Sequence, residues 1–422
     1  MSSLQPSLFA GSTPAVFEPD SLERSLTEFR WNGRETLREQ VTFDYGGESL
    51  AVNSFVNEFW TSRQRAAHSL HEVSYRACFK PQLPRFFIER LTRIGDVVYD
   101  PFMGRGTTLL EAALLERIPA GCDVNPLSQV LVGPRLAPPT IEAVEARLKE
   151  ICWTSADECP EELLTFYHPE TLRELCALRT HLLNSSLDDV DRWIQMVAVN
   201  RLTGHSSGFF SVYTLPPNQA VSLAAQSKIN AARNQVPTRR DVPRLILAKS
   251  RSLLSDCDER TIQVIQGAGA RRQLITSTAS HTPSLPSSSV SLVVTSPPFL
   301  DVVDYAGDNW LRGWFCGIDP AGVSLTVVKK IDEWRVAMTL VFSELARVLV
   351  PGGHVAFEVG EVRGGKVRLE EHVLPCGVAA GLEPRLVVIN SQQFTKTAAC
   401  WGVQNNRKGT NTNRIVVFRK AG

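Results

Sequence analysis

A strand–loop–helix–strand unit over residues 97–123 constrains the fold of this chain more than any other feature. Val97–Tyr99 is a short apolar run that ends at Asp100, as expected of a buried parallel strand. A glycine-containing turn follows, and the pattern of residues 107–117 predicts a helix. A second short strand ends at Asp123. This alternation predicts an α/β fold of the doubly wound type, with a mostly parallel sheet.

Further strand patterns complete the expected sheet. They lie at residues 273–276, 290–295, 354–359, 386–390 and 414–418. Together with the first unit they predict a sheet of about seven strands. Between residues 127 and 272 the pattern is largely helical, and this stretch is too long for a simple crossover between strands. We therefore expect an inserted helical domain there.

Composition excludes some classes of protein. The formal net charge is +1, from 45 Lys and Arg against 44 Asp and Glu, so only local clusters of charge can indicate a nucleic-acid partner. The nine cysteines are scattered without a CxxC pair, which argues against a disulfide scaffold and against a metal site. No stretch is long and apolar enough to span a bilayer, so we expect a cytoplasmic protein without a membrane partner.

The loop DPFMGRGTT, residues 100–108, has the properties of a nucleotide-type site. Its glycines let the backbone pass close to a ligand, and the helix that follows presents free N–H groups at its positive end. One strand later, Asp123 is placed to accept hydrogen bonds from ribose hydroxyls. The loop is not a P-loop, because no Gly-Lys-Ser/Thr follows. A plain α/β turn or a dinucleotide fingerprint is the alternative, which the complete string makes less favourable.

A second motif, TSPPF, stands at the end of the strand over residues 290–295. Ligands bind at the carboxyl ends of strands in sheets of this kind. Two prolines stiffen the loop, and the Ser296 hydroxyl beside rigid carbonyls makes a compact acceptor site for an amino group. Phe299 can stack on a planar base. Taken alone, the motif also fits a proline-rich turn.

Together these motifs resemble motif I and motif IV of the DNA amino-methyltransferases. The Ser-Pro-Pro-aromatic form is similar to the N4-cytosine enzymes, whereas adenine-N6 enzymes more often have Asp or Asn before Pro-Pro. Lys80-Pro81-Gln82-Leu83 resembles motif X, which gives the order X, I, insert, IV. The resemblance covers about residues 71–126 and 273–418 and implies a Rossmann-like fold with S-adenosylmethionine as cofactor.

The resemblance implies roles for individual residues. The expected cofactor-binding residues are Lys80, Asp100, Phe102, Gly104, Gly106, Thr107, Thr108, Asp123 and Asn125. The expected catalytic residues are Ser296, Pro297, Pro298 and Phe299, of which Ser296 and the Pro297 carbonyl hold the target amino group. The stretch after the third strand, ITSTAS, lacks the family's usual polar residue for the cofactor adenine, so that contact is unassigned.

The motif order also implies a division of the chain. Residues 1–70 are expected as an N-terminal arm and lead-in, 71–126 as the first part of the catalytic domain, 127–272 as the target-recognition insert, and 273–422 as the second part of the catalytic domain. Basic residues of the insert are candidate phosphate contacts, although they equally fit a solvated helix face. They are Arg233, Arg239, Arg240, Arg244, Lys249 and Arg251.

We therefore expect a site-specific methyltransferase acting on the N4 of cytosine in double-stranded DNA, by base flipping and direct transfer. Three alternatives stay open: adenine-N6 methylation of DNA, methylation of an RNA base amino group, and a catalytically idle DNA-binding regulator. A cognate restriction endonuclease is left open as a partner. Pro375-Cys376 also fits a cytosine-C5 nucleophile, but a packed thiol within a helix is favoured.

Overall fold

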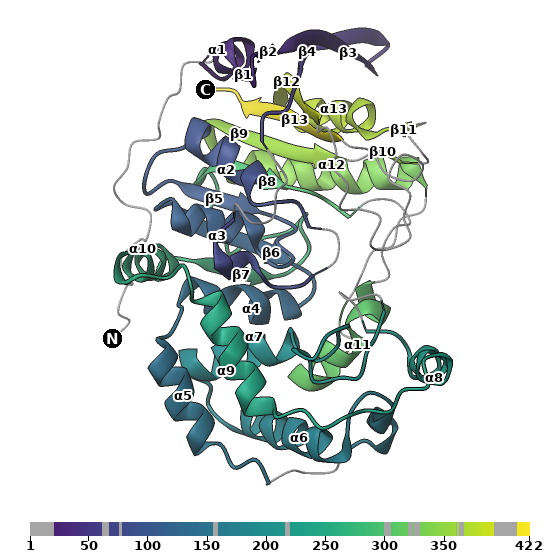
Figure 1. Cartoon of the computed structure of the whole chain (residues 1–422). Coiled ribbons are helices and arrows are strands. Elements are labelled where there is room, and N and C mark those ends of the chain that lie inside the picture. The colour runs from purple at the N-terminus through teal and green to yellow at the C-terminus, as the bar shows by residue number, and fades with distance from the viewer. Residues whose placement is uncertain are drawn as a thin grey trace.

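In a computed structural model, a large mixed sheet carries helices on both faces and a helical body at one end (Figure 1). The structure describes residues 21–60, 67–75, 78–154, 159–215, 220–298, 305–319, 323, 330–359, 361–362, 367–391 and 412–422. No helix in these ranges is both long and apolar enough to cross a bilayer. The same ranges contain no group of three or more His, Cys, Asp or Glu side chains that could hold a metal ion.

The main sheet has nine strands among the described residues, and the predicted strand patterns all lie in it. From one edge to the other the strands are β7 (Gln273–Thr276), β6 (Ile118–Asp123), β5 (Val97–Asp100), β8 (Val290–Thr295), β9 (Leu349–Val359), β13 (Thr412–Lys420), β12 (Leu382–Ser391), β4 (Glu48–Asn57) and β3 (Leu37–Tyr45). Strands β5 to β9 are parallel, and β13 is antiparallel to both of its neighbours. The α/β fold with a mostly parallel sheet is therefore confirmed.

Two-residue periodicity gives the sheet its two apolar faces. Val98 packs on one face with α1 (Ser21–Glu28) and α2 (Gln82–Leu91), while Tyr99 packs on the other with α12 (Ile331–Val348) and α13 (Leu369–Ala379). Neighbouring residues of β8, β9 and β13 alternate between the same two clusters. The near-continuous apolar runs in the sequence follow from this burial on both sides.

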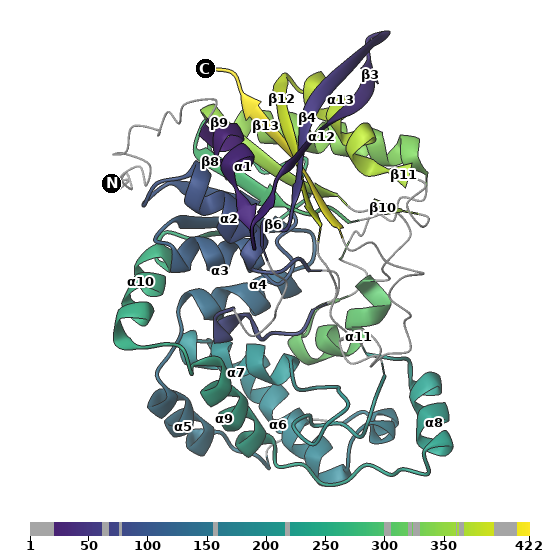
Figure 2. The same cartoon turned by 45° about the horizontal axis from the view of Figure 1, so that its top comes forward.

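Strands β3 and β4 extend the sheet beyond the seven expected strands. They form a hairpin that pairs with β12 through β4, and the hairpin projects past the end of the sheet (Figure 2). The expected lead-in over residues 1–70 therefore contributes strands to the sheet. Residues 1–20 lie outside the described residues. Edge strand β3 buries only Val41 and Phe43, so its apolar pattern is weak in the sequence.

The helical body lies between β6 and β7, where the sequence predicts the insert. It contains α4 (Leu127–Val132), α5 (Ile141–Glu150), α6 (Pro169–Asn184), α7 (Asp189–Val199), α8 (Leu223–Ala232) and α9 (Val242–Leu253). These helices share one apolar cluster with α3 (Thr107–Leu114), so the body is continuous with the cofactor end of the sheet.

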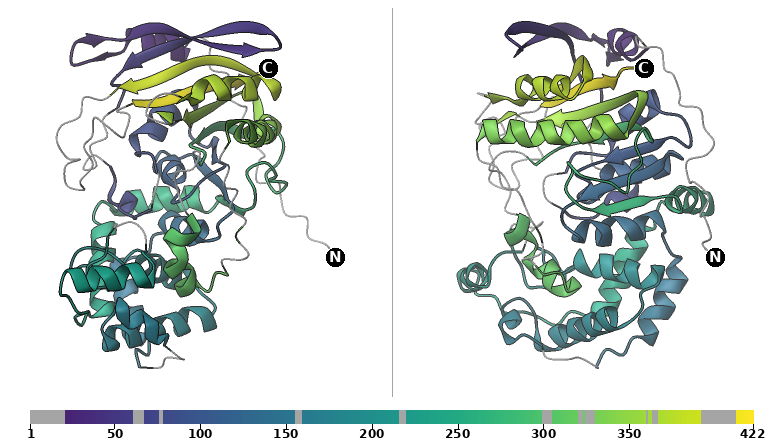
Figure 3. Two further views of the ribbon diagram at one scale, coloured as in Figure 1. Left: turned by 90° about the vertical axis from the view of Figure 1, so that its right-hand side faces the viewer. Right: turned by 180° about the vertical axis from the view of Figure 1, so that it is seen from behind.

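Two helices differ from the expected division of the chain. Helix α10 (Glu259–Gly269), placed in the insert by the sequence, packs against α3 and β6 and leads into β7. Helix α11 (Tyr305–Cys316) follows β8 but contacts α4, α6 and α7 of the helical body (Figure 3). The helix after the first loop also ends earlier than expected, at Leu114, and Pro119 lies inside β6.

An amide clamp at the end of β12 fixes the chain that leaves β4. Asn390 is fully buried, and its side chain accepts a bond from the Trp60 N–H and donates to the Trp60 carbonyl, both at 3.2 Å. We expect Asn390→Ala to lower the free energy of unfolding by about 2–3 kcal/mol, because it removes two hydrogen bonds between a buried side chain and the Trp60 backbone. Urea unfolding measures this change. The neighbouring variant Ser391→Ala is the control and should change stability by less than about 0.5 kcal/mol; equal losses in the two variants would contradict the clamp.

Candidate functional site

Polar residues lie close together at the side of the sheet where the carboxyl ends of the parallel strands are found. The strand order reverses between β5 and β8, and ligands bind at such a switch point in open α/β sheets. Asp100 ends β5, Asp123 ends β6, and Ser296 follows β8. Glu358 lies near the end of β9, and the antiparallel strand β13 begins at the same edge.

Asp100 organises the cofactor loop from beneath. Its carboxylate accepts hydrogen bonds from the Thr295 hydroxyl at 2.6 Å and from the Phe102 N–H at 3.0 Å. Burial raises the pKa of Asp100 to about 7, against these hydrogen bonds and with a small contribution from Asp123. Only 1% of Asp100 is exposed, so it shapes the loop rather than lining an open surface.

Two glycines allow the loop to turn. Gly104 and Gly106 have φ of +47° and +73°, in the region that favours glycine. A Cβ on Gly106 would stand 2.5 Å from Cγ2 of Val132 in α4, whereas the nearest side-chain atom to a Cβ on Gly104 is Cε1 of Tyr75 at 3.5 Å. Gly106 is therefore required for packing against the helical body.

Asp123 connects the loop to the second strand. Its two carboxylate oxygens accept bonds from the N–H groups of Gly104 and Asn125, each at 2.9 Å, and burial raises the pKa of this carboxyl. A carboxylate oxygen has a second lone pair, so Asp123 can still accept ribose hydroxyls. Asn125 accepts a bond from the Leu127 N–H, so its side chain is engaged in starting α4.

The remaining predicted cofactor residues lie around the same loop. Thr108 is fully buried and donates to the Val294 carbonyl at 3.0 Å, which makes it a positioning residue. Thr107 is buried and accepts a bond from Arg105. Lys80 is half-buried, and burial together with Arg105 lowers the pKa of its ammonium.

The arrangement fits S-adenosylmethionine. The N-terminus of α3 has no side-chain cap, so its N–H groups remain available to a carboxylate. Asp123 stands one strand away for the ribose, and no side chain of Gly104 intervenes. Lys80, Gly104, α3 and Asp123 would hold the cofactor, and Asp100 would fix the loop.

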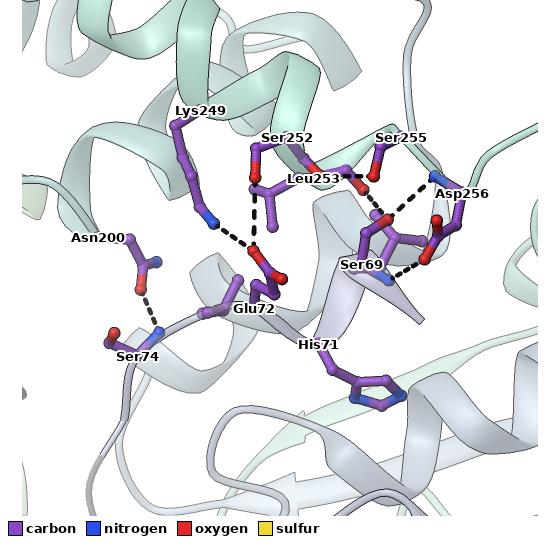
Figure 4. A network of polar contacts seen from close by, with 12 residues as sticks. Ser69, His71, Glu72, Ser74, Asn200, Lys249, Ser252, Leu253, Ser255 and Asp256 are labelled. Atoms are coloured by element: carbon purple, nitrogen blue, oxygen red, sulfur yellow. Dashed lines mark hydrogen bonds and ion pairs between the residues drawn. The ribbon is translucent and has the colours of Figure 1, made fainter. Parts of the chain in front are cut away.

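The segment 67–75, which the sequence analysis did not assign, forms a wall beside this loop. Arg105 donates to the Val73 carbonyl at 2.8 Å, and buried His71 contacts Glu111 of α3 at 2.7 Å. On its other side the segment is bound to the helical body (Figure 4): Glu72 pairs with Lys249 at 3.2 Å, and Ser69 donates to Asp256 at 2.8 Å. The signal in the sequence was a run of polar residues without a periodic pattern.

The target-binding loop begins beside Asp100. Thr295 is fully buried and bonded to that carboxylate, so Ser296 is held next to the cofactor loop. Pro297 is buried, and the carbonyl of exposed Pro298 accepts a bond from the Trp334 indole at 3.2 Å. Phe299 lies outside the described residues.

Glu358 lies next to Ser296 and Asn413 lies next to Glu358, and neither residue was predicted from the sequence. Glu358 lies beside Ser296, because Thr295 and Phe357 are paired on adjacent strands, and its carboxylate accepts a short bond from the Asn413 amide. Burial raises the pKa of Glu358 to about 7. An acidic residue in a buried strand, in GGHVAFEVG, was the available signal.

The basic residues of the insert are mostly engaged with other side chains. Lys249, Arg251 and Arg239 pair with carboxylates, and Arg233 stacks on Tyr213. Arg240 is half-buried and Arg244 is exposed. The expected patch is therefore less basic than its sequence suggests, because three of its charges have acidic partners.

Cys376, the alternative nucleophile, is a packed thiol. It is buried in α13, and its sulfur donates to the His372 carbonyl at 3.1 Å. Burial raises the pKa of this thiol. A neutral buried thiol is a poor nucleophile.

Comparisons with known proteins agree with the cofactor motifs. A family model, N6_N4_Mtase, described as DNA methylase, matches residues 35–128, which include β3, β4, the loop after β5 and β6. The type II methyltransferase M.MjaII of Methanocaldococcus jannaschii is 34% identical over 74 residues, 18% of this chain and 14% of that protein. M.BsoBI of Geobacillus stearothermophilus is 22% identical over 349 residues, 76% of this chain and 59% of that protein.

A TehB-like SAM-dependent methyltransferase from Corynebacterium glutamicum overlaps with 80% of this chain and 86% of its own, at 9% identity and a TM-score of 0.29. That overlap is too weak to support a conclusion. The chain spans less than two thirds of the length of both curated relatives.

The sheet and its cofactor loop have the arrangement expected of an S-adenosylmethionine-dependent methyltransferase. The family match and the relatives are similarities to DNA amino-methyltransferases, and they agree with the resemblance predicted from the motifs in the cofactor-binding part of the chain.

Gly106→Ala should disrupt the loop. The added methyl group clashes with Val132 at a positive φ, so we expect a loss of about 2–4 kcal/mol in unfolding free energy and weaker cofactor binding. Gly381→Ala is the matched control, because Gly381 has φ +80° with nothing within 4 Å of its Cβ. Urea unfolding and calorimetry should separate the two; similar small losses in both would sink the packing role.

Asp100→Asn tests the buried carboxylate. The folded pKa of Asp100, about 7, lies above its ordinary 3.8, so its contribution to stability is present below pH 4 and is lost as pH rises to 7. The neutral amide avoids that loss. The variant should exceed the wild type in stability by roughly 2 kcal/mol at pH 8, with the gap closing toward pH 4. Urea unfolding at both pH values decides, and a gap that does not change with pH would count against a raised pKa.

Proposed function

We propose that this protein is a site-specific DNA methyltransferase that transfers a methyl group from S-adenosylmethionine to the exocyclic N4 of cytosine in duplex DNA. The observation that supports this most is the hydrogen bond from Thr295 to Asp100 at 2.6 Å. It ties the target loop after β8 to the cofactor loop after β5, so a methyl donor and an amino acceptor would lie side by side. The choice of cytosine follows from Ser296 in a TSPPF motif that resembles the N4-cytosine enzymes.

The residues of the site suit transfer to an amino group. When bound, the cofactor supplies an electrophilic sulfonium methyl group. Ser296 Oγ and the Pro297 carbonyl are acceptors that can bind the two N–H groups of the amino nitrogen. Those bonds favour a pyramidal nitrogen, whose lone pair is then free of the ring. Positioning of this kind requires no covalent intermediate.

Base flipping is the expected route to the site. An enzyme that acts on a base takes it out of the duplex stack, so the target base is expected to leave the duplex at a cost of a few kcal/mol. The helical body between β6 and β7 is proposed as the target-recognition region. Exposed Arg244 is the best candidate there for a phosphate contact, since three of the other insert cations have acidic partners.

The first test is methyl transfer from labelled S-adenosylmethionine to mixed-sequence duplex DNA and to total RNA, read by nucleoside mass spectrometry. N4-methylcytosine in DNA is the expected product. N6-methyladenine would overturn the cytosine assignment, and label in RNA alone would overturn the DNA assignment. Cofactor binding with no product from either polymer, including genomic DNA of many sequences, would favour an idle DNA-binding regulator.

Ser296→Ala should lower kcat on DNA by about 10-fold to 100-fold, because it removes one acceptor for the amino group. The dissociation constant of S-adenosylmethionine should change less than twofold, since Ser296 belongs to the target loop. Steady-state kinetics and calorimetry measure the two quantities. Weaker cofactor binding with normal kcat would contradict the assigned role.

A further inference from the structure

Glu358, at the target end of the site, is a buried carboxylate with no cationic partner in the part of the chain that the structure describes. It is 7% exposed, it accepts a hydrogen bond from the Asn413 amide, and the neighbouring Ser296 hydroxyl lowers its pKa against the larger effect of burial. Among the described residues, no charged group contributes to its titration. A buried carboxylate of this kind is destabilising, so its presence indicates a function other than stability.

Glu370 shows the contrasting case on the neighbouring helix α13. It is fully buried, but it forms an ion pair with Arg414 of β13 at 2.6 Å. Asn413 and Arg414 are consecutive residues of β13 and serve different carboxylates. The strand therefore gives a cation to the carboxylate of α13 and a neutral amide to Glu358.

The three contacting residues come from three adjacent strands. Ser296 follows β8, Glu358 lies in β9, and Asn413 is the second residue of β13. Thr295 is paired with Phe357, which sets Ser296 beside Glu358, and Ile415 is paired with Glu358 from the other side. The pairing of three strands thus fixes the carboxylate from both sides.

We propose that Glu358 is a positioning residue that fixes the direction of the Ser296 hydroxyl proton. A hydroxyl has one proton and two lone pairs. When the Ser296 hydroxyl donates its hydrogen bond to ionised Glu358, both lone pairs of Ser296 Oγ face the target. The oxygen then acts toward the target only as a hydrogen-bond acceptor. The site then selects an exocyclic amino group over a ring nitrogen or a carbonyl. This inference rests on the proposed function and adds a residue to it.

Protonation of Glu358 would reverse this preference. A protonated carboxyl can donate to Ser296 Oγ, and the hydroxyl proton is then free to point at the target. Other titratable groups nearby are Asp100, which reaches Ser296 through Thr295, and the Glu370–Arg414 pair behind β13. Because the pKa of Asp100 is also raised to about 7, the pH test must separate the two carboxylates.

The experiment compares Glu358→Gln with the wild type at saturating S-adenosylmethionine. The expected result is a kcat lower by 10-fold to 100-fold at pH 8, with a cofactor dissociation constant within twofold of the wild type. The fall in wild-type kcat below about pH 7 should flatten in Glu358→Gln. Glu358→Asp, which keeps the charge, should recover part of the activity. Asp100→Asn separates the two carboxylates in the same pH series. An unchanged kcat in Glu358→Gln, or an acid limb that persists in Glu358→Gln and disappears in Asp100→Asn, would overturn the proposal.

Two controls separate positioning from folding. In the double variant Ser296→Ala/Glu358→Gln, kcat should fall little further than in Ser296→Ala alone, because the carboxylate acts through that hydroxyl. Additive losses would contradict this. Glu370→Gln, the matched buried carboxylate, should lower stability yet keep the pH profile of kcat, since its partner is Arg414.

A measurement independent of activity completes the test. The Glu358 carboxyl is followed by ¹³C NMR in protein with labelled glutamate and identified by its loss in Glu358→Gln. Ser296→Ala should raise the titration midpoint of Glu358, because the hydroxyl bond favours the ionised form. An unchanged midpoint would overturn the contact itself. A shifted midpoint in a protein that yields N6-methyladenine would refute the cytosine assignment alone.

Discussion

The hydrogen bond between Thr295 and Asp100 joins the two halves of the site, and much of the surrounding structure depends on it. Asp100 ends β5 and Thr295 ends β8, the two strands between which the order of the sheet reverses. Thr108, at the start of α3, donates to the carbonyl of Val294, the residue before Thr295. Strand and target loop are therefore fixed by one buried carboxylate, whose burial is offset by the bonds it accepts.

The carboxylates at the carboxyl ends of the parallel strands share one electrostatic feature, which is that burial disfavours their charged form. Asp100, Asp123 and Glu358 all have raised pKa values, and burial is the main cause for each. Elsewhere the fold pairs its buried or partly buried acids with arginine, as in Glu344 with Arg347 and Glu370 with Arg414. Among the described residues, these three carboxylates form no ion pair, and they lie where a cofactor and a target base are expected, which is the pattern of a functional site.

The helical body and the cofactor loop form one continuous structure. Val132 of α4 packs on Gly106, and the segment 67–75 bonds to Arg105 on one side and to residues of α9 and the turn after it on the other. Lys249, expected from the sequence to contact phosphate, instead holds Glu72 of that segment. The helices of the body and α3 also share one apolar cluster. A movement of the proposed recognition helices would therefore displace the cofactor loop that precedes α3.

Local sequence determined the strands and the motif loops of this protein. Two kinds of signal are contained in a few consecutive residues. One is the apolar run of a buried strand, as in β5, β6, β8 and β13, and the other is the glycine that permits a positive φ, as in DPFMGRGTT. The predicted strands over 273–276 and 290–295 match β7 and β8. Ser296 could be selected as a candidate for the same reason, because the residues of its motif are consecutive in the sequence.

Only the tertiary structure decided which distant residues meet. Glu358 and Asn413 are 62 and 117 positions from Ser296, and strand pairing rather than any motif brings them together. Strands β3 and β4 joined the sheet through a parallel pairing with β12, which lies more than 300 positions away. Packing likewise decided that some basic residues of the insert, such as Lys249, pair with a carboxylate, whereas Arg244 is exposed to solvent. Periodicity records burial along one segment, and it carries no information on the partner that buries it.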